Sequence, residues 1–395
     1  MKNQHHSSQL LRKMTPRSPH ESHRVATPLE LLYDLVFVVA IAFATETLHH
    51  GILEHHIADS ITTYLLSFFS IWWAWVQFTS FASSYDNDDL IYRIAVIFQM
   101  LGALIIAASI KMNSLPMLFT GYMLIRFIGI LLWLRVAVDS PKDKPMATRF
   151  IKAIGLCQLG WAIIVFMPRL GLPGYLFMIT CELLAPLYCK RKQEETYWHP
   201  KHIAERYGLM TIIVLGESVL SITVALKHLA EQVAVKQLNP ELPALIAASI
   251  LLLFSIWWLY FLDEREELLT SQKRAFQWGY THFFIFASIG AVGAGINIAT
   301  DTLVTSHTPN PLLANASLAI ASILYLASIW LCHQRLHKQP NTLIWLFAAC
   351  LIGVSIWLPY GPLCMAVIFV LLLAYEIKCR STGVVSLSTL SETGD

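Results

Sequence analysis

Long apolar runs, separated by short polar or Pro/Gly-rich breaks, fill most of this chain. Twelve runs can be recognised, with approximate limits 29–48, 59–83, 90–110, 115–138, 149–167, 172–188, 204–225, 242–262, 276–299, 313–333, 342–358 and 362–378. A helix of about 20 apolar residues crosses a bilayer, and in lipid each backbone group must be paired within its own segment. The pattern therefore predicts an all-α polytopic membrane protein with about twelve transmembrane helices. The last two runs are short, and a re-entrant pair would keep the same termini.

Composition supports a membrane protein. Of the 395 residues, 56% are apolar and 14% are charged, against about 25% charged in soluble domains. The lipid bilayer is therefore the main expected partner. Residues 1–28 are polar and basic and lack the apolar segment of a signal peptide. We expect them to form a disordered cytoplasmic tail, and residues 379–395 a second one.

The distribution of Lys and Arg predicts the orientation. With the N-terminus inside, 23 of the 28 Lys and Arg residues fall in inside segments and 4 in outside loops, with Arg126 left within a span. Short cytoplasmic loops carry this excess of positive charge. The split supports the span count and predicts an inner membrane protein with both termini in the cytoplasm.

A short sequence repeat suggests two related halves. The run Phe69–Trp73 (FSIWW) recurs unchanged at Phe254–Trp258, and three weaker matches follow in the same order along the chain. We interpret this as a duplication with a first half at 29–188, a linker at 189–203 and a second half at 204–378. Because each half has six spans, the repeat would be parallel, with a site at the interface of the halves. The alternative is a set of fortuitous matches between apolar helices.

The same residues carry a family resemblance. The segment Thr27–Val38 (TPLELLYDLVFV), the Trp72-Trp73 pair followed by Tyr85–Asp88 (YDND), and the stretch from His202 to Ser218 resemble the low temperature requirement A protein family. The resemblance covers about residues 25–378. It implies a bacterial integral membrane protein linked genetically to growth in the cold, and it brings no established substrate or mechanism.

Acidic residues within the apolar runs are the first candidates for function. Glu30 and Asp34 lie four residues apart and so share one helix face. They either complement a helix N-terminus or form a functional carboxylate pair. Glu217 is the only charge within 209–220, with Ser221 on its face. Intramembrane carboxylates usually mark ion or proton pathways, and we favour that role over a purely structural one.

A single arginine within a span requires a partner. Arg126 keeps its charge, because guanidinium does not lose its proton in proteins. The available buried carboxylates are Glu217, Asp34 and Glu182. We expect one of them to pair with Arg126, and we expect the buried charges to gather around one shared cavity.

Other polar and aromatic residues have simpler explanations. Glu205, Arg206 and His282 are further candidates for an ion or proton pathway, because His282 could titrate near neutral pH. The favoured explanations are a local capping cluster of Glu205 and Arg206 with His202, and a satisfied core histidine at His282. The tryptophans of the repeated run are expected to anchor the protein at the interface, with an aromatic pocket as the alternative: Trp72, Trp73, Trp257 and Trp258. The Tyr85–Asp89 loop is expected to be solvated, because it lacks the spacing of a calcium loop. The histidines at 49, 50, 55 and 56 are a minor metal or acid-sensing candidate.

No nucleotide, hydrolase or metalloprotease motif occurs in the chain. The seven cysteines show no CxxC spacing, so we expect no metal site, no disulfide and no cofactor. Nucleic-acid binding has no support, and a homo-oligomer is left open. The favoured function is a proton- or ion-coupled secondary transporter for a small molecule or ion, rather than an enzyme. The alternatives are an ion channel or membrane sensor, and a membrane-embedded enzyme acting on lipid.

Overall fold

The computed structural model describes residues 11–18, 21, 24–189, 198–262, 269, 272–304, 310–332 and 341–392. These residues form twelve α-helices and no β-strand, which confirms the all-α prediction. The helices are α1 (Pro28–Leu53), α2 (Ile57–Tyr85), α3 (Leu90–Lys111), α4 (Leu115–Asp139), α5 (Lys144–Phe166), α6 (Gly171–Cys189), α7 (Pro200–Ala234), α8 (Glu241–Phe261), α9 (Gln272–Val304), α10 (Pro311–Cys332), α11 (Thr342–Val354) and α12 (Gly361–Glu392).

Eleven of these helices are long and apolar enough to cross a membrane. The exception is α11, whose 13 residues are followed by the short 3-10 helix Ser355–Trp357. The number of helices therefore equals the predicted number of spans. Eleven of the twelve helices have the length and composition of a span. Helix α12 runs to Glu392, well past the expected end at residue 378, so the C-terminal tail expected to be disordered is helical as far as residue 392.

The exposed surface of the spans is apolar, whereas several charges lie inside. Phe166 on α5 is 84% exposed and Phe177 on α6 is 67% exposed, while Arg126 is 3% exposed and Glu182 is fully buried. A soluble protein would show the reverse arrangement. The pattern is that of helices solvated by lipid, with their polar groups turned inward.

The chain divides into two compact units. Unit 1 comprises residues 1–44 and 65–207, and unit 2 comprises residues 45–64 and 208–395. The end of α1 and the beginning of α2 thus belong to unit 2, and the first eight residues of α7 belong to unit 1. The duplication of two six-helix halves stays a prediction.

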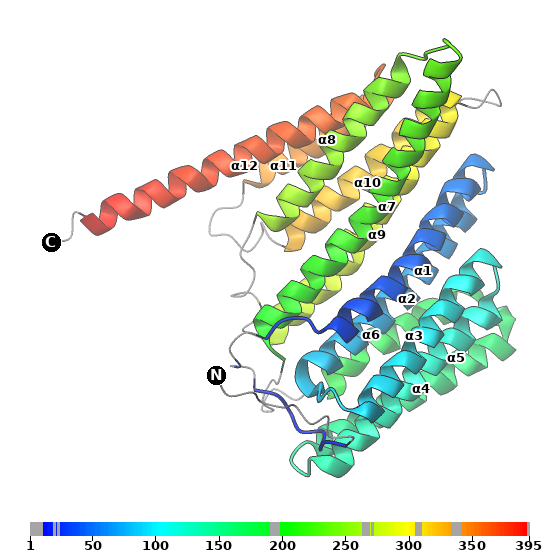
Figure 1. The fold of residues 1–395 in the computed structure, drawn as a ribbon, viewed down its shortest axis with the longest axis vertical. Coiled ribbons are helices and arrows are strands. Elements are labelled where there is room, and N and C mark those ends of the chain that lie inside the picture. Colours follow the sequence, from blue (N-terminus) through cyan, green and yellow to red (C-terminus); the bar gives the residue numbers. More distant parts are fainter. Residues whose placement is uncertain are drawn as a thin grey trace. The chain divides into compact units, whose positions relative to one another are not determined.

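In unit 1, helices α3, α4, α5 and α6 pack in succession, as Figure 1 shows. Two glycines bring α3 and α4 together backbone to backbone. A Cβ at Gly121 would lie 2.6 Å from the carbonyl oxygen of Gly102, and a Cβ at Gly102 would lie 2.8 Å from that of Gly121. Small residues allow such close approach between membrane helices.

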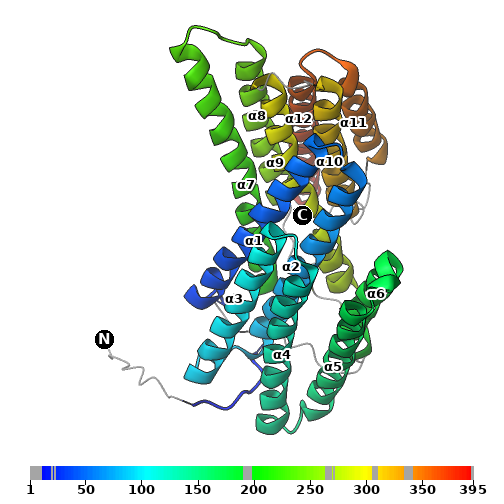
Figure 2. The ribbon, with the colours of Figure 1, turned by 90° about the vertical axis from the view of Figure 1, so that its right-hand side faces the viewer.

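In unit 2, α9 packs against α10, and α8 packs against α12, while α11 contacts both α10 and α12 (Figure 2). The part of α7 in this unit contributes to an apolar cluster. Its Ile222 and Ala225 pack with Leu242 and Ile246 of α8. The helix ends of unit 2 are therefore held by ordinary apolar burial.

The described part of the N-terminal segment is docked on unit 1, along the ends of its helices (Figure 1). The backbone N–H of Met14 donates to Asp139 over 2.9 Å, and that of Arg17 donates to the Ser84 carbonyl over 2.8 Å. The Met14 side chain is fully buried. The expectation of a wholly disordered segment at 1–28 is therefore wrong for residues 11–18 and 24–27, because polar groups at the helix ends supply partners for its backbone.

Candidate functional site

An ion pair joins α1 and α7 inside unit 1. The Asp34 carboxylate accepts a hydrogen bond from Nη2 of Arg206 over 2.6 Å and a second from Nε1 of Trp75 on α2 over 2.7 Å. All three side chains are fully buried. The charge of Asp34 is therefore matched by a guanidinium rather than by water.

Glu30 extends this cluster by one helical turn toward the start of α1. Its Oε1 lies 3.1 Å from Nη1 of Arg206 and 3.2 Å from Nε2 of His202. Its Oε2 accepts from the backbone N–H of Thr27 over 2.7 Å, while Oγ1 of Thr27 accepts from the N–H of Glu30 over 3.3 Å. This reciprocal arrangement is a capping box. Glu30 thus caps α1 and binds α7 at the same time, which supports the explanation of a helix N-terminus. A functional role of this carboxylate stays a prediction.

Aromatic rings enclose Arg206. Its guanidinium carbon lies 6.0 Å from the ring centre of Trp75 and 5.6 Å from that of Phe78, within the range of cation–π contacts. Oδ2 of Asp34 and the hydroxyl of Tyr33 are buried without a hydrogen-bond partner among the described residues. The cluster is buried and only partly satisfied among the described residues.

The expected local capping cluster at the start of α7 is wrong, because its residues reach other elements. Arg206 and His202 bind carboxylates of α1, as described above. Glu205 accepts from the backbone N–H of Ala26 over 3.2 Å and so holds the segment that leads into α1. Helix α7 is thus tied to the N-terminal segment at its first two turns.

Two carboxylates of the loop between α2 and α3 are buried, in contrast to the expectation of a solvated loop, whereas Asp88 is exposed. Asp86 is 4% exposed and Asp89 is 1% exposed. Burial raises the pKa of Asp86 to about 6, and the nearby charge of Glu30 adds to this, whereas Arg24, 3.7 Å away, opposes it. Two carboxylates thus compete for the guanidinium of Arg24, which also lies 3.8 Å from Glu30.

Asp89 behaves in the opposite way. Burial alone would raise its pKa, but hydrogen bonds from Arg135 and from the backbone N–H groups of Arg12 and Tyr92 hold it at about 2. The bond from Tyr92, over 2.9 Å, caps the start of α3. The bond from Arg12 holds the N-terminal segment at the same place. Asp89 therefore joins three elements at one end of unit 1.

A second ion pair of unit 1 joins α4 and α6. Nη2 of Arg126 lies 2.7 Å from Oε2 of Glu182. The same carboxylate accepts from Trp73 over 3.0 Å, from Tyr122 over 3.0 Å and from Trp161 over 3.3 Å. Of the three proposed partners of Arg126, Glu182 is therefore the one that binds it. Four donors leave this carboxylate fully satisfied, which is the geometry that makes a buried ion pair tolerable.

The buried charges do not form one ion-pair cluster. Asp34 binds Arg206, Arg126 binds Glu182, and neither pair includes Glu217. Trp73 and Trp75 lie two residues apart on α2 and bind different pairs. Trp73 donates to Glu182, and Trp75 donates to Asp34. Arg126 and Asp34 therefore have separate partners, although each of these residues and Glu217 is buried. The expectation that the buried charges gather around one shared cavity stays a prediction.

Glu217 lies within unit 2, near the middle of α7. Its side chain is 7% exposed, and its carboxylate has no ion-pair or hydrogen-bond partner among the described residues. Helix α9 approaches closely here, because a Cβ at Gly293 would lie 3.3 Å from Cγ of Glu217. The hydroxyl of Ser221 donates to the carbonyl of Glu217 over 3.0 Å or to that of Gly293 over 3.1 Å. Ser221 thus binds backbone rather than the carboxylate.

Unsatisfied polar atoms accompany Glu217 on the helices of unit 2. Oγ1 of Thr45, Oγ of Ser218 and Oδ1 of Asn297 are buried without hydrogen-bond partners among the described residues. Thr45 and Tyr64 both lie close to Gly290 of α9. Near the ends of α1 and α9, Nε2 of His49 lies 2.8 Å from the Asp301 carboxylate. Buried polar groups of α1, α7 and α9 in this unit are thus left without partners among the described residues.

The remaining sequence candidates have structural roles. His282 is fully buried, bonded to the Trp278 carbonyl over 2.7 Å and to the Tyr260 hydroxyl over 3.1 Å, so it is a satisfied core histidine as expected. The two copies of the repeated tryptophan pair differ. Trp257 and Trp258 are 42% and 48% exposed, as anchors would be, whereas Trp72 and Trp73 are buried. Interfacial anchoring is therefore wrong for the first pair.

Among the residues that the structure describes, no group of three His, Cys, Asp or Glu side chains could hold a metal ion. His49 instead pairs with Asp301, and His50 lies 3.7 Å from Glu46. The geometry can thus support ion pairing and proton exchange in a lipid-solvated bundle.

Eleven span-length helices with inward charges define a multi-pass, all-α membrane protein. The chain belongs to the bacterial low temperature requirement A protein family, whose pattern it matches over residues 25–375. It is also 24% identical, over 262 residues, to an uncharacterised protein of Rhizobium meliloti (strain 1021). That match covers 60% of this chain and 58% of the relative, so the chain spans somewhat more than half of the relative's length.

Proposed function

We propose that this protein is a proton-coupled secondary transporter for a small solute, with Glu217 as the residue that carries the coupling proton. The observation that supports this role is a contrast among the buried carboxylates. Glu30, Asp34 and Glu182 each lie within 3.1 Å of a guanidinium nitrogen. Glu217 is also buried, at 7% exposed, but has no such partner among the described residues.

The cost of charge in lipid makes this contrast meaningful. An ionised carboxylate at the centre of a membrane helix costs roughly 3 kcal/mol on insertion scales. An arginine offsets that cost at Asp34 and Glu182. At Glu217 only a proton or a transient cation can do so, and a group that alternates between these states can couple one flux to another.

A polar face of α9 offers a path for the proton. Gly293, Asn297 and Asp301 follow one another at intervals of four residues and so lie on one face of the helix. Gly293 packs at Glu217, Oδ1 of Asn297 has no hydrogen-bond partner among the described residues, and Asp301 pairs with His49. Water between these groups would connect Glu217 with the end of α9.

The orientation is part of the proposal. The excess of Lys and Arg in alternate connections supports cytoplasmic termini in the inner membrane. In that orientation, His49 and Asp301 lie at the outer ends of their helices, so protons would enter from outside by way of this pair.

Proton flux in liposomes tests the proposal. Purified protein is reconstituted with a pH-sensitive dye inside, an acid-outside gradient is imposed, and a panel of small solutes is added in turn. We expect wild-type protein to admit protons only when a transported solute is present. Glu217→Gln should abolish this flux, because the amide binds no proton at neutral pH. Glu54→Gln, an exposed site of unit 2, is the matched control and should keep the wild-type rate.

Two results would contradict the proposal. One is proton entry by Glu217→Gln at the wild-type rate. The other is the lack of solute-dependent flux by wild-type protein across the panel. Steady current without any solute gradient would instead indicate a channel.

A further inference from the structure

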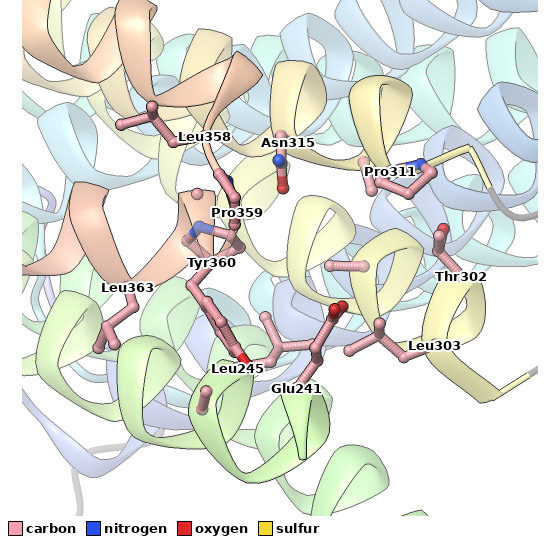
Figure 3. A pocket seen from close by; sticks show the side chains of 15 residues that line it. Glu241, Leu245, Thr302, Leu303, Pro311, Asn315, Leu358, Pro359, Tyr360 and Leu363 are labelled. Atoms are coloured by element: carbon pink, nitrogen blue, oxygen red, sulfur yellow. The ribbon is translucent and has the colours of Figure 1, made fainter. Parts of the chain in front are cut away.

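A half-open pocket of about 160 Å³ lies within unit 2, where several helices begin or end (Figure 3). Its walls come from the first turns of α8 and α10, the last turns of α9 and the segment 358–363, which leads into α12. Most of the lining is apolar. Glu241 is the single charged side chain among the described residues that line it.

Apart from the Tyr360 hydroxyl, which can donate or accept, the polar side-chain atoms of this pocket are hydrogen-bond acceptors. Nδ2 of Asn315 donates to the Ile356 carbonyl over 3.1 Å, which leaves its Oδ1 for the pocket, as Figure 3 shows. The hydroxyl proton of Thr302 is used by the Ile298 carbonyl over 2.8 Å. An ionised carboxylate accepts and does not donate. The side chains of Glu241, Asn315 and Thr302 therefore favour a ligand that supplies the donors.

The helix N-termini around the pocket raise the opposite alternative, because their positive ends attract anions. Several of their donors are, however, already used or missing. Pro311 and Pro362 have no N–H. The N–H of Leu313 donates to Oδ1 of Asn310 over 3.0 Å, and the carbonyl of Tyr360 accepts the next N–H groups of α12. An anion would also lie beside the Glu241 carboxylate, so charge complementarity favours a cation.

Size and lining narrow the class of cation. At about 30 Å³ for each water in the liquid, the pocket has room for roughly five waters or a similar number of heavy atoms. Leu245, Leu303 and Leu363 supply apolar wall, and the ring of Tyr360 lies beside Glu241 (Figure 3). An ammonium beside a carboxylate and an aromatic face, with a short alkyl chain against leucines, uses each of these features.

We propose that this pocket binds a short alkylammonium group, with the ammonium at Glu241 and Asn315 and the alkyl chain against the leucines. The ligand chemistry is shared by free amines and by an ethanolamine lipid headgroup. The site lies apart from Glu217 and does not depend on a transport role for that residue.

Calorimetric titration of the protein in nanodiscs tests the proposal, with empty nanodiscs as the blank. The probes are butylammonium, butanol and butyrate, which share one chain length and differ in charge. In phosphatidylcholine discs we expect butylammonium to bind at least tenfold more tightly than either other probe. Repeating the titration in discs that contain phosphatidylethanolamine distinguishes the sources. Weaker apparent binding there indicates that the lipid headgroup occupies the site, and unchanged binding indicates a free amine.

Variants locate the site. Glu241→Gln should lower butylammonium affinity at least tenfold, and Ala244→Leu, which fills the pocket but keeps the carboxylate, should lower it similarly. Glu54→Gln should leave the affinity unchanged. Thermal unfolding shows whether each variant is folded. Two pocket variants are used so that the proposal can still be tested if one of them does not fold. Equal binding of butanol, tighter binding of butyrate, no binding of any probe, or unchanged affinity in both pocket variants would overturn the proposal.

Discussion

Replacing Glu182 by glutamine tests how the buried charges stabilise unit 1. The change keeps the shape of the side chain but leaves Arg126, which is 3% exposed, without a counter-charge. Breaking a buried ion pair by removing one partner costs about 3–5 kcal/mol. We therefore expect the free energy of unfolding to fall by about that amount.

The surroundings of the pair make the two single variants unequal. When Arg126 is replaced by methionine, the Glu182 carboxylate keeps its hydrogen bonds from Trp73, Tyr122 and Trp161. It can also take up a proton, whereas a guanidinium cannot lose one. Arg126→Met should therefore cost less than Glu182→Gln. The double variant should recover most of the loss, because no unpaired charge is left.

Reversible unfolding in mixed micelles, followed by circular dichroism, measures these differences, and Glu54→Gln is the exposed control. The reasoning is refuted if Glu182→Gln lies within about 1 kcal/mol of wild type, which is the range of exposed pairs. It is also refuted if Arg126→Met is the more damaging change.

Three further predictions concern other contacts. Because burial raises the pKa of Asp86 to about 6 in the folded protein, above the ordinary value near 4, its contribution to stability is present below about pH 4 and lost as the pH rises through 6. Asp86→Asn should flatten the fall in unfolding free energy between about pH 4 and 6. Gly121→Leu should destabilise by about 1–3 kcal/mol or more through its clash with α3, whereas Gly155→Ala, which meets nothing within 4 Å, should be neutral or stabilising in the same unfolding assay. Trp73→Phe should cost about 1 kcal/mol through its lost hydrogen bond, and the exposed Trp258→Phe should cost much less by the same measurement.

The fold was accessible from the sequence because apolar length alone fixes membrane helices. Predicted limits such as 90–110 and 115–138 differ from α3 and α4 by a single residue at most. The prediction was weaker for α7 and α9, whose 35 and 33 residues extend past the apolar runs. Polar residues at helix ends continue a helix without any hydrophobic signal, so their inclusion could not be foreseen.

The buried charges were identified as single residues. Glu182 was one of three proposed partners of Arg126, and the pair of Asp34 and Arg206 was not predicted. Asp34, Glu182 and Arg126 stand out within apolar runs, because lipid makes any charge conspicuous. Arg206 was assigned a local role, because it lies near the start of a span, where charges are ordinary. Its partner Asp34 is 172 positions away in the sequence, and a single sequence contains no signal for such a distance.

The aromatic donors were missed for a related reason. Trp73, Trp161 and Tyr122 bind Glu182, yet tryptophan and tyrosine in a span are equally typical of interfacial anchors. The loop at Asp86 and Asp89 was expected to be solvated, because acidic loops usually are. Both carboxylates are buried by the N-terminal segment and its arginines, which composition alone marked as a tail.

The proton state of Glu217 tests the central claim most directly. Infrared spectra of the protein in lipid, recorded as the pH is stepped through neutrality, report protonated carboxylic acids by their carbonyl stretch. We expect the wild-type protein to show a protonated-acid band near neutral pH. Glu217→Gln should remove this band, and Glu54→Gln should retain it. A spectrum in which Glu217→Gln leaves that band unchanged would contradict the role of Glu217 as a proton carrier.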